Sequence, residues 1–276
     1  MGELLEGPEA MIHFGESINA VLTMLALSTA RLYIAFMVLP PLAAQTIQGP
    51  MRNGVCLLMG FYMAWGQPAH AFEGYSTALL LALIGKEAII GLMLGFAFSV
   101  VFWVAEGVGA MIDNMAGFNN VQQTNPQSGE QSTPVSNVLA QLVTAGFFML
   151  NGMLVCIGLI IQSFTWWPLH KLAPTLAGGM EDFVSFQMYS YLSTVAKIAA
   201  PIMLVLVLID LSIGLISKTA EKLEPNNLGQ PIKGAVATLM LALLVSAYFD
   251  QARPIIGLQN LESQLRAWAQ GQAQKQ

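Results

Sequence analysis

Long apolar runs alternate with shorter polar connections along this chain. Six apolar segments can be drawn, at Ile18–Leu42, Gly54–Trp65, Ala78–Ala105, Asn137–Trp167, Val184–Ser217 and Gly234–Phe249. A helix needs about 20 apolar residues to cross a bilayer. Four of the segments reach or exceed that length, and the second and sixth fall short of it. The pattern predicts an all-α, polytopic hydrophobic protein with long kinked helices and helical hairpins.

The fifth segment is too long for one simple span and contains Pro201 near its middle. Proline removes a helical hydrogen bond and kinks the helix, so we expect a bent helix or a hairpin there. Basic residues do not set an orientation. Six spans would place four Lys or Arg residues on each side, once the three inside segments are set aside. The positive-inside rule then gives no answer, which suits helices held by partner subunits.

Composition narrows the class of protein. Of the 276 residues, 55% are apolar and 10% are charged, and the mean hydropathy is +0.61. Soluble domains carry about 25% charged residues, so a soluble monomer is excluded. The net charge of −5 argues against nucleic acid as a partner, because nucleic-acid binding needs clustered Lys and Arg. A polytopic membrane protein or a buried subunit of a large assembly remains.

The chain is predicted to form one unit over residues 1–276, with its hydrophobic helical region at 18–249. The polar stretch at 106–136 is the longest connection and has no Lys or Arg. Its Gly, Asn, Gln and Pro residues predict a loop. A polar C-terminal tail covers 251–276.

No enzyme signature accompanies these segments. Gly85-Lys86-Glu87 lacks the remaining residues of a phosphate-binding loop. Glu106 and Asp113 would share one helix face, but no nucleophile or cofactor motif stands near them. The two cysteines lie a hundred residues apart without metal-ligand spacing. We therefore expect no catalytic, cofactor-binding or metal-binding residues, and no cofactor.

Ionisable residues inside apolar segments carry more information. An unpaired charge in apolar surroundings is costly, so each one needs a partner on another helix, a partner subunit or a water-filled cavity. Lys197 and Asp210 are thirteen residues apart and lie on nearly opposite faces of an unbroken helix, which prevents them from pairing. The candidates for buried charge or assembly are Arg31, Lys86, Glu87, Lys197 and Asp210. Two readings stay open: an ion pair between subunits, or the lining of a translocation path.

Gly91 and Gly95 form a small-xxx-small pattern in the third segment. Such a pattern lets another helix backbone approach closely. We therefore predict that these two glycines are helix-packing residues.

Four groups of residues carry a resemblance to a known family. They are Arg31 with Pro40-Pro41 and Pro50-Met51-Arg52; Gly85-Lys86-Glu87 through Gly91, Gly95-Phe96 and Trp103 to Glu106-Gly107-Val108-Gly109 and Asp113; Asn125-Pro126-Gln127-Ser128-Gly129; and Ala200-Pro201 to Asp210 with Gly214, Ser217-Lys218 and Gly229-Gln-Pro231-Ile-Lys233. In this combination the chain resembles the SctT/FliR/SpaR family, the export-gate subunit of type III secretion systems. Lys218, Asn125 and the run at 222–228 depart from the flagellar pattern and favour the injectisome branch.

The resemblance implies a non-enzymatic structural and gating subunit in a helical pseudo-ring. Its partners would be SctR and SctS homologues, with one copy of this chain, then SctU, SctV, an inner-rod or needle adaptor, unfolded secreted substrates and membrane lipid. The location implied is the bacterial inner membrane, multi-pass, within the secretion basal body.

A loop after the third hydrophobic segment helps to plug the closed channel in that family. By position it is Glu106–Gln122 here. The implied plug or gate residues are Glu106, Gly107, Gly109, Met111, Asp113, Met115, Gly117 and Phe118. The alternative function is a secondary transporter or permease subunit for a small solute, which should transport that solute alone in liposomes.

Overall fold

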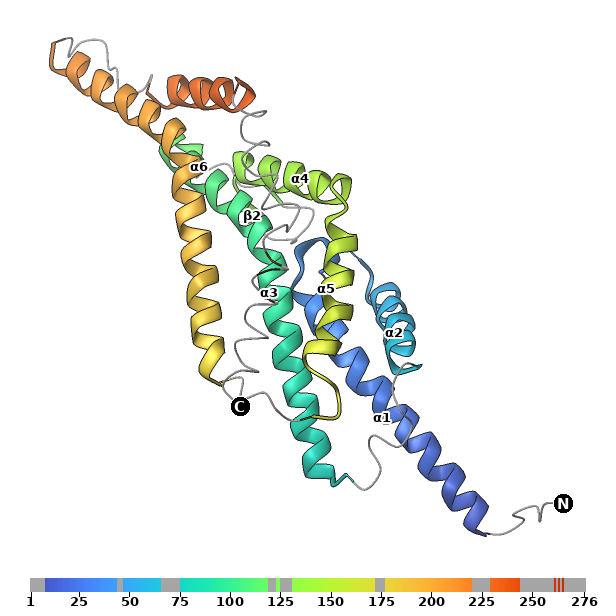
Figure 1. Ribbon diagram of the computed structural model, residues 1–276. Helices are drawn as coiled ribbons and strands as arrows, with labels where there is room; N and C mark the ends of the chain where they lie inside the picture. The colour runs from blue at the N-terminus through green and yellow to red at the C-terminus, as the bar shows by residue number, and fades with distance from the viewer. Residues whose placement is uncertain are drawn as a thin grey trace. The chain divides into compact units, whose positions relative to one another are not determined.

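Helices make up most of the structure, which is a computed structural model (Figure 1). It describes residues 8–43, 47–65, 75–118, 123–124, 131–171, 177–219, 229–243 and the single residues 261, 263 and 265. The elements in chain order are α1 (Pro8–Val38), the short 3-10 helix η1 (Pro40–Leu42), α2 (Gly49–Trp65), α3 (Thr77–Ala116), β1 (Gln123–Thr124), β2 (Gln131–Ser132), α4 (Pro134–Met149), α5 (Gly152–Trp166) and α6 (Ala177–Thr219). Residues 229–243 form one further helix. Strands β1 and β2 are a two-residue antiparallel pair that joins Gln123 to Ser132 and Thr124 to Gln131.

Within the described part of the chain, three helices are long and apolar enough to cross a membrane, and the bent pair α4–α5 makes a fourth if it counts as one span. The all-α, polytopic class is thus confirmed. Helix α2 has 17 residues and does not meet the length needed for a span. Residues 244–249 of the sixth predicted segment lie outside the described part of the chain.

The fifth apolar segment is one helix, and the hairpin alternative is wrong. Helix α6 runs for 43 residues with Pro201 inside it, as the unbroken ribbon in Figure 1 shows. The fourth segment is the one that breaks. Asn151 has a φ of 59°, a left-handed conformation that asparagine tolerates better than most residues. Helices α4 and α5 meet there at a bend of 68°.

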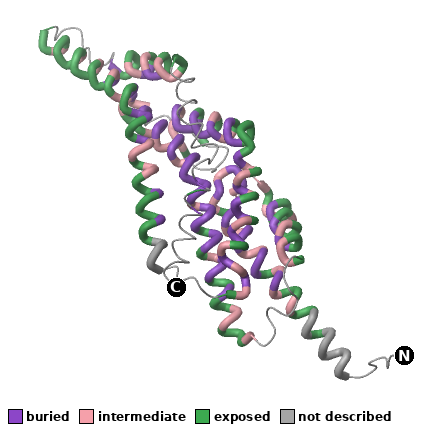
Figure 2. Tube along the Cα trace, in the orientation of Figure 1, coloured by how far each residue is buried: buried purple, intermediate pink, exposed green. Residues whose placement is uncertain are grey.

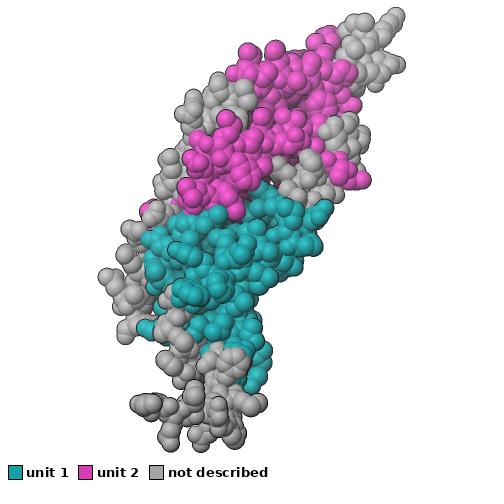
Figure 3. All heavy atoms as spheres, turned by 90° about the vertical axis from the view of Figure 1, so that its right-hand side faces the viewer, with its two compact units in different colours: residues 1–98, 156–178, 265–276 teal, residues 99–155, 179–264 magenta. Residues whose placement is uncertain are grey.

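The chain divides into two compact units (Figure 3). Unit 1 comprises residues 1–98, 156–178 and 265–276, and unit 2 comprises residues 99–155 and 179–264. The core of unit 1 includes Leu32, Phe36 and Trp167, and that of unit 2 includes Phe102 and Phe147. Whether the chain also behaves as the single domain expected from its sequence stays a prediction.

Burial differs sharply between the long helices. In the most apolar window of each helix, 72% of α3 residues are buried within the chain but only 22% of α6 residues. Figure 2 shows the same contrast along the trace. An apolar helix this exposed needs lipid or other protein against it, because large apolar patches are rare on free soluble surfaces.

Candidate functional site

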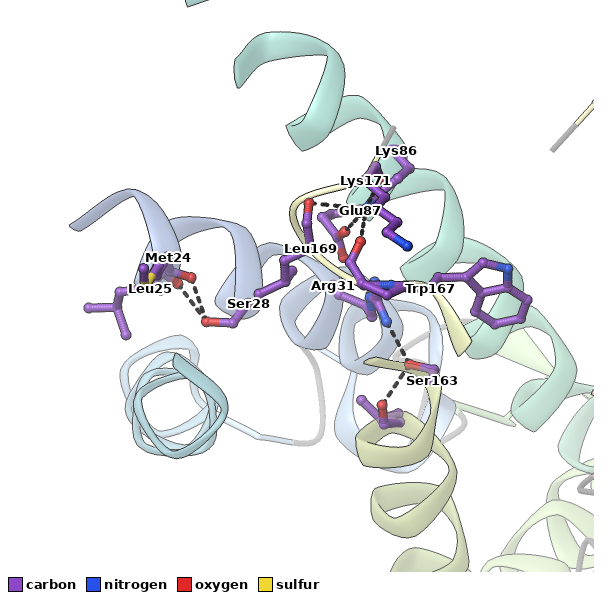
Figure 4. A network of polar contacts seen from close by, with 12 residues as sticks. Met24, Leu25, Ser28, Arg31, Lys86, Glu87, Ser163, Trp167, Leu169 and Lys171 are labelled. Atoms are coloured by element: carbon purple, nitrogen blue, oxygen red, sulfur yellow. Dashed lines mark hydrogen bonds and ion pairs between the residues drawn. The ribbon is translucent and has the colours of Figure 1, made fainter. Parts of the chain in front are cut away.

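Arg31 lies in the C-terminal part of α1 and is fully buried in unit 1. Its Nε atom is 2.6 Å from Oε2 of Glu87 on α3. The Nη1 atom donates to the Ser163 hydroxyl at 2.9 Å, and Nη2 donates to the Trp167 carbonyl at 2.9 Å. The guanidinium also lies 4.0 Å from the centre of the Phe164 ring. Arg31 thereby joins α1, α3 and the end of α5 (Figure 4).

Lys86 completes this cluster from the other side of Glu87. Its Nζ atom is 2.8 Å from Oε1 of Glu87. The same ammonium donates to the carbonyl oxygens of Pro168, Leu169 and Lys171, at 2.8, 3.3 and 3.0 Å. These carbonyls lie just beyond the C-terminus of α5, where the negative end of the helix dipole also favours a cation. We call Arg31, Lys86 and Glu87 the buried charge cluster.

The two packing glycines lie one and two turns beyond this cluster on α3. A Cβ atom built on Gly91 would lie 2.5 Å from the carbonyl oxygen of Arg31, and one on Gly95 would lie 2.8 Å from that of Ala35. No side chain fits at such distances. The neighbour that approaches these glycines is therefore α1 of the same chain.

Lys197 and Asp210, the other two predicted buried charges, are exposed in the isolated chain. Asp210 keeps 47% of its side chain exposed and is 3.0 Å from Nζ of Lys233, on the helix at 229–243. Its ionic partner within the chain is thus on the next helix. Burial of Lys197 and Asp210 by other subunits stays a prediction.

The C-terminal part of α3 corrects the predicted start of the polar loop. Helix α3 continues through Glu106 and ends at Ala116, so the boundary predicted at Glu106 is wrong. The predicted end at 136 is wrong as well, because α4 begins at Pro134. Residues 119–122 of the predicted plug and 125–130, which include the Asn125–Gly129 motif, lie outside the described residues. Most of the tail at 251–276 does too.

Asp113 holds the start of α4 against the end of α3 in unit 2. Its carboxylate is fully buried and accepts the backbone N–H groups of Val135 at 3.0 Å and Ser136 at 3.1 Å. Val135 and Ser136 are the second and third residues of α4, and N–H groups in the first turn of a helix lack partners within it. The Ser136 hydroxyl donates to the Glu106 carbonyl at 3.0 Å. The N-cap residue Thr133 makes no side-chain capping bond. Asp113 of α3 supplies this bond instead.

Two glycines let other helices reach this part of α3. A Cβ atom on Gly109 would overlap the backbone of Ser136 at the start of α4. One on Gly107 would lie 2.8 Å from the Tyr191 hydroxyl of α6. These contacts explain why a stretch with two glycines remains helical, since tertiary packing overrides weak helix propensity. Met111 is 40% exposed, and Glu106 and Met115 are half-buried.

The chain turns away from α3 at Gly117, whose φ is +83°. Residues other than Gly, Asn and Asp rarely adopt this backbone conformation. The Gln230 side chain lies 3.0 Å from the place of a Cβ atom on Gly117. The next residue, Phe118, packs its ring against Gly234, where a Cβ atom would lie 2.7 Å from Cζ. The helix at 229–243 therefore holds the first residues after α3.

An apolar cavity of about 470 Å³ lies beside the Phe118 ring. Val135, Val138 and Leu139 of α4 line it on one side, and Leu241 and Ala242 line it on the other. The ring therefore has room to leave its place against Gly234. No cluster of His, Cys, Asp or Glu in the described part of the chain could hold a metal ion.

Comparison with known proteins decides the family. Residues 22–257 match the family model described as bacterial export proteins, family 1. The chain belongs to this family. It is 31% identical to the Yop proteins translocation protein T of Yersinia pestis over 217 residues, which cover 77% of this chain and 82% of that protein.

Two further relatives are less similar to this chain. The surface presentation of antigens protein SpaR of Salmonella typhimurium is 24% identical, over 83% of this chain and 84% of that protein. The flagellar biosynthetic protein FliR of Bacillus subtilis is 27% identical, over 65% and 69%. The resemblance to the SctT/FliR/SpaR family is confirmed. The chain is a membrane-embedded subunit of a multi-subunit secretion apparatus.

Sequence reasoning missed several residues of these sites. The three carbonyls around Lys86 were not foreseen, because backbone acceptors leave no trace in a sequence. Ser163 was not foreseen because it is 132 residues from Arg31 and no local spacing connects them. Gln230 and Gly234 were not singled out as contacts of the loop that follows α3. The family's Gly-Gln-Pro run at 229–231 was the one available signal.

Proposed function

We propose that this chain is a structural and gating subunit of a type III secretion export gate, without enzymatic activity. It forms the channel with SctR and SctS homologues, as one copy in the bacterial inner membrane, and contacts SctU, SctV and the rod or needle adaptor. Unfolded proteins pass through the centre of this assembly. Its family membership and the exposed apolar surface of α6 support an assembled, membrane-embedded role.

The observation that carries the gating role is the junction at the end of α3. Gly117 has a left-handed backbone conformation that turns the chain away from α3, and Phe118 rests against Gly234 beside an apolar cavity. A seal for a protein channel must close tightly against ions and still yield to a passing chain. An aromatic ring that rests against a glycine, with space beside it, meets both needs. The segment from Gly117 to Gln122 is the plug, and the α3 residues from Glu106 to Met115 position it.

Membrane conductance of cells that contain the assembled apparatus tests this role. Gly234→Leu places a side chain where the Phe118 ring lies, so we expect higher conductance with the complex still assembled. Phe118→Ala should act in the same direction, because it removes the apolar stopper. Gly214→Leu is the matched control, since a Cβ atom at Gly214 meets nothing within 4 Å.

Thiol labelling gives a second measurement of the same gate. A Phe118→Cys variant should react slowly with a maleimide in the idle apparatus and faster during secretion. Both native cysteines are buried, and burial raises the pKa of the Cys56 thiol to about 11, so little thiolate is present to react. Unchanged conductance together with equal labelling in both states would reject the plug.

Partner composition separates this proposal from a solute transporter. We expect the tagged chain, extracted in mild detergent, to bring down SctR and SctS homologues that mass spectrometry identifies. The chain alone should carry no solute flux in liposomes. Flux by the isolated chain, without co-purifying subunits, would support the transporter instead.

A further inference from the structure

The helix at 229–243 presents two neighbouring rows of residues to two different parts of unit 2. Gly229 and Lys233 form one row, and Gln230 and Gly234 form the next, because residues four apart lie on the same side of a helix. The first row contacts α6. The second row contacts the residues that follow α3. The helix therefore connects α6 to the start of the plug.

The row that faces α6 makes one polar and one apolar contact. Nζ of Lys233 is 3.0 Å from Oδ1 of Asp210. A Cβ atom built on Gly229 would lie 3.4 Å from Cδ1 of Ile213, which is an ordinary van der Waals distance. Asp210 and Ile213 are three residues apart and thus lie on one side of α6. The Lys233 side chain is only 15% exposed, so most of it is covered where it meets α6.

The second row contacts the first two residues beyond α3. The Gln230 side chain lies 3.0 Å from the place of a Cβ atom on Gly117, and a Cβ atom on Gly234 would lie 2.7 Å from Cζ of Phe118. Lys233 and Gly234 are neighbours in one helical turn, so they move together. A shift of the helix away from α6 therefore also shifts the surface against which the Phe118 ring rests.

Helix α6 is itself held on α3 farther along the chain. The Tyr191 hydroxyl lies 2.8 Å and Cγ2 of Val195 lies 3.2 Å from the place of a Cβ atom on Gly107. Asp210 follows Val195 by fifteen residues, which is about 22 Å along a helix. Helices α3, α6 and the helix at 229–243 thus form a closed frame of three helices. The ion pair between Asp210 and Lys233 closes this frame.

We propose that the Asp210–Lys233 ion pair is a latch that positions the helix at 229–243 and so keeps the Phe118 ring in place in the closed channel. This inference rests on the plug proposed above and adds two positioning residues to it. Ile232 and Leu239 of the same helix are 45% and 59% exposed. The chain itself therefore leaves much of this helix uncovered, and contacts such as the ion pair decide its position.

The pair has the strength that such a latch requires. The Asp210 side chain is 47% exposed, and exposed ion pairs stabilise a fold only slightly. A seal held by a much stronger contact would resist a passing chain. Loss of the pair should therefore change the fraction of open channels without unfolding the chain. We expect a small open fraction to rise about fivefold.

Charge reversal and charge exchange test the latch in cells that contain the assembled apparatus. Lys233→Asp places two carboxylates side by side, and Asp210→Lys places two ammonium groups there. Each should raise membrane conductance about fivefold per assembled complex, with the amount of complex measured by co-purification of sister subunits. The double variant Asp210→Lys with Lys233→Asp restores opposite charges, and its conductance should return close to that of the wild type. Side chains that only fill space would not give this rescue.

Two further variants separate the latch from charge in general and from the plug. Lys218→Asp reverses an exposed cation in the last turn of α6 and should leave conductance unchanged. Gly234→Leu tests the plug directly. If Gly234→Leu raises conductance and Lys233→Asp does not, the latch is overturned and the plug stands. If neither variant raises conductance, both proposals are rejected.

A covalent tether gives a second measurement that does not depend on charge. In the variant Asp210→Cys with Lys233→Cys both charges are absent, and bismaleimidoethane joins the two introduced thiols. We expect raised conductance before the reaction and a return close to wild-type conductance in the cross-linked complexes. No rise before cross-linking, or no fall after it, would overturn the proposal.

Discussion

Glu87 and Asp113 are two fully buried carboxylates on one helix, α3, and they are stabilised in different ways. Glu87 belongs to unit 1 and lies between two cations, with Arg31 at 2.6 Å and Lys86 at 2.8 Å. Asp113 belongs to unit 2 and accepts backbone N–H groups at the start of α4. No cation within the described residues forms an ion pair with Asp113 in this structure.

The difference concerns what remains when each carboxylate is neutralised. Without Glu87, two buried cations lose their shared counter-ion. Without the charge of Asp113, a helix N-terminus loses a favourable partner, and its partial charge is only about half a unit. The first change leaves full charges in an apolar interior, while the second leaves two weaker donors. The buried charge cluster should therefore be the more sensitive of the two.

The largest expected effect is that of Glu87→Gln. Removing one partner of a buried ion pair costs about 3–5 kcal/mol, because the other charge stays buried and uncompensated. We expect a large fall in the thermal unfolding temperature of the purified complex, or loss of the chain from membranes by proteolysis. Thermal unfolding in detergent and quantitative immunoblotting of membranes measure these outcomes.

A double variant shows whether charge, and not shape, is responsible. Replacing a buried ion pair by apolar residues can be nearly neutral. Arg31→Met with Glu87→Gln should therefore be more stable than Glu87→Gln alone. If the double variant is as unstable as the sum of the single variants, the two side chains are not energetically coupled.

The close packing of α3 on α1 in unit 1 gives a further test, with a somewhat smaller expected loss of stability. Gly95→Leu would force a side chain into the carbonyl of Ala35, where a Cβ atom already lies at 2.8 Å. Overpacking of this kind costs about 1–3 kcal/mol. Gly85→Leu lies on the same helix, where a Cβ atom meets nothing within 4 Å, and should be tolerated. Because the neighbour is α1, the unfolding temperature of the chain itself should fall; equal unfolding temperatures for both variants would contradict the close contact.

The sequence allowed the helices and the isolated charges to be predicted, but not the partners. Arg31 stood out because it interrupts an apolar run. Its partner Glu87 is 56 residues away, and no local spacing connects two such positions. Lys86 is held mainly by carbonyl oxygens, and every residue type supplies those.

The loop boundary was misplaced for a related reason. Gly107, Gly109, Asp113 and Asn114 are weak helix formers, and their composition resembles a loop. In the structure Gly109 is the surface on which α4 lies, and Asp113 caps that helix. Both residues serve tertiary contacts that a single sequence does not reveal. The pattern at Gly91 and Gly95 predicted a close approach without naming the partner helix, and the structure places α1 beside both glycines.

Asp113→Asn should have a smaller effect than Glu87→Gln. The amide keeps the size of the side chain and one acceptor oxygen, but it loses the charge that favours a helix N-terminus. Loss of an N-cap interaction costs about 0.5–2 kcal/mol. We expect faster hydrogen exchange at the first turn of α4 and a modest fall in unfolding temperature. An effect as large as that of Glu87→Gln would mean that Asp113 also neutralises a cation.

Asp210 provides the exposed reference for both buried carboxylates, and its replacement should have the smallest effect on the chain. Its ion pair with Lys233 is 3.0 Å long, but nearly half of the Asp210 side chain is exposed, and exposed pairs contribute about 0–1 kcal/mol. Asp210→Ala should therefore leave the unfolding temperature of the isolated chain within a few degrees of the wild type.

The assembled apparatus is the sharper measurement, because subunits that cover Asp210 would bury the pair. Asp210→Ala should then reduce co-purification of sister subunits more than Asp250→Ala, whose residue lies at the end of the last apolar segment. Equal, negligible losses in both variants would show that Asp210 stays in contact with water in the complex, and burial alone would then account for the ranking of the three carboxylates.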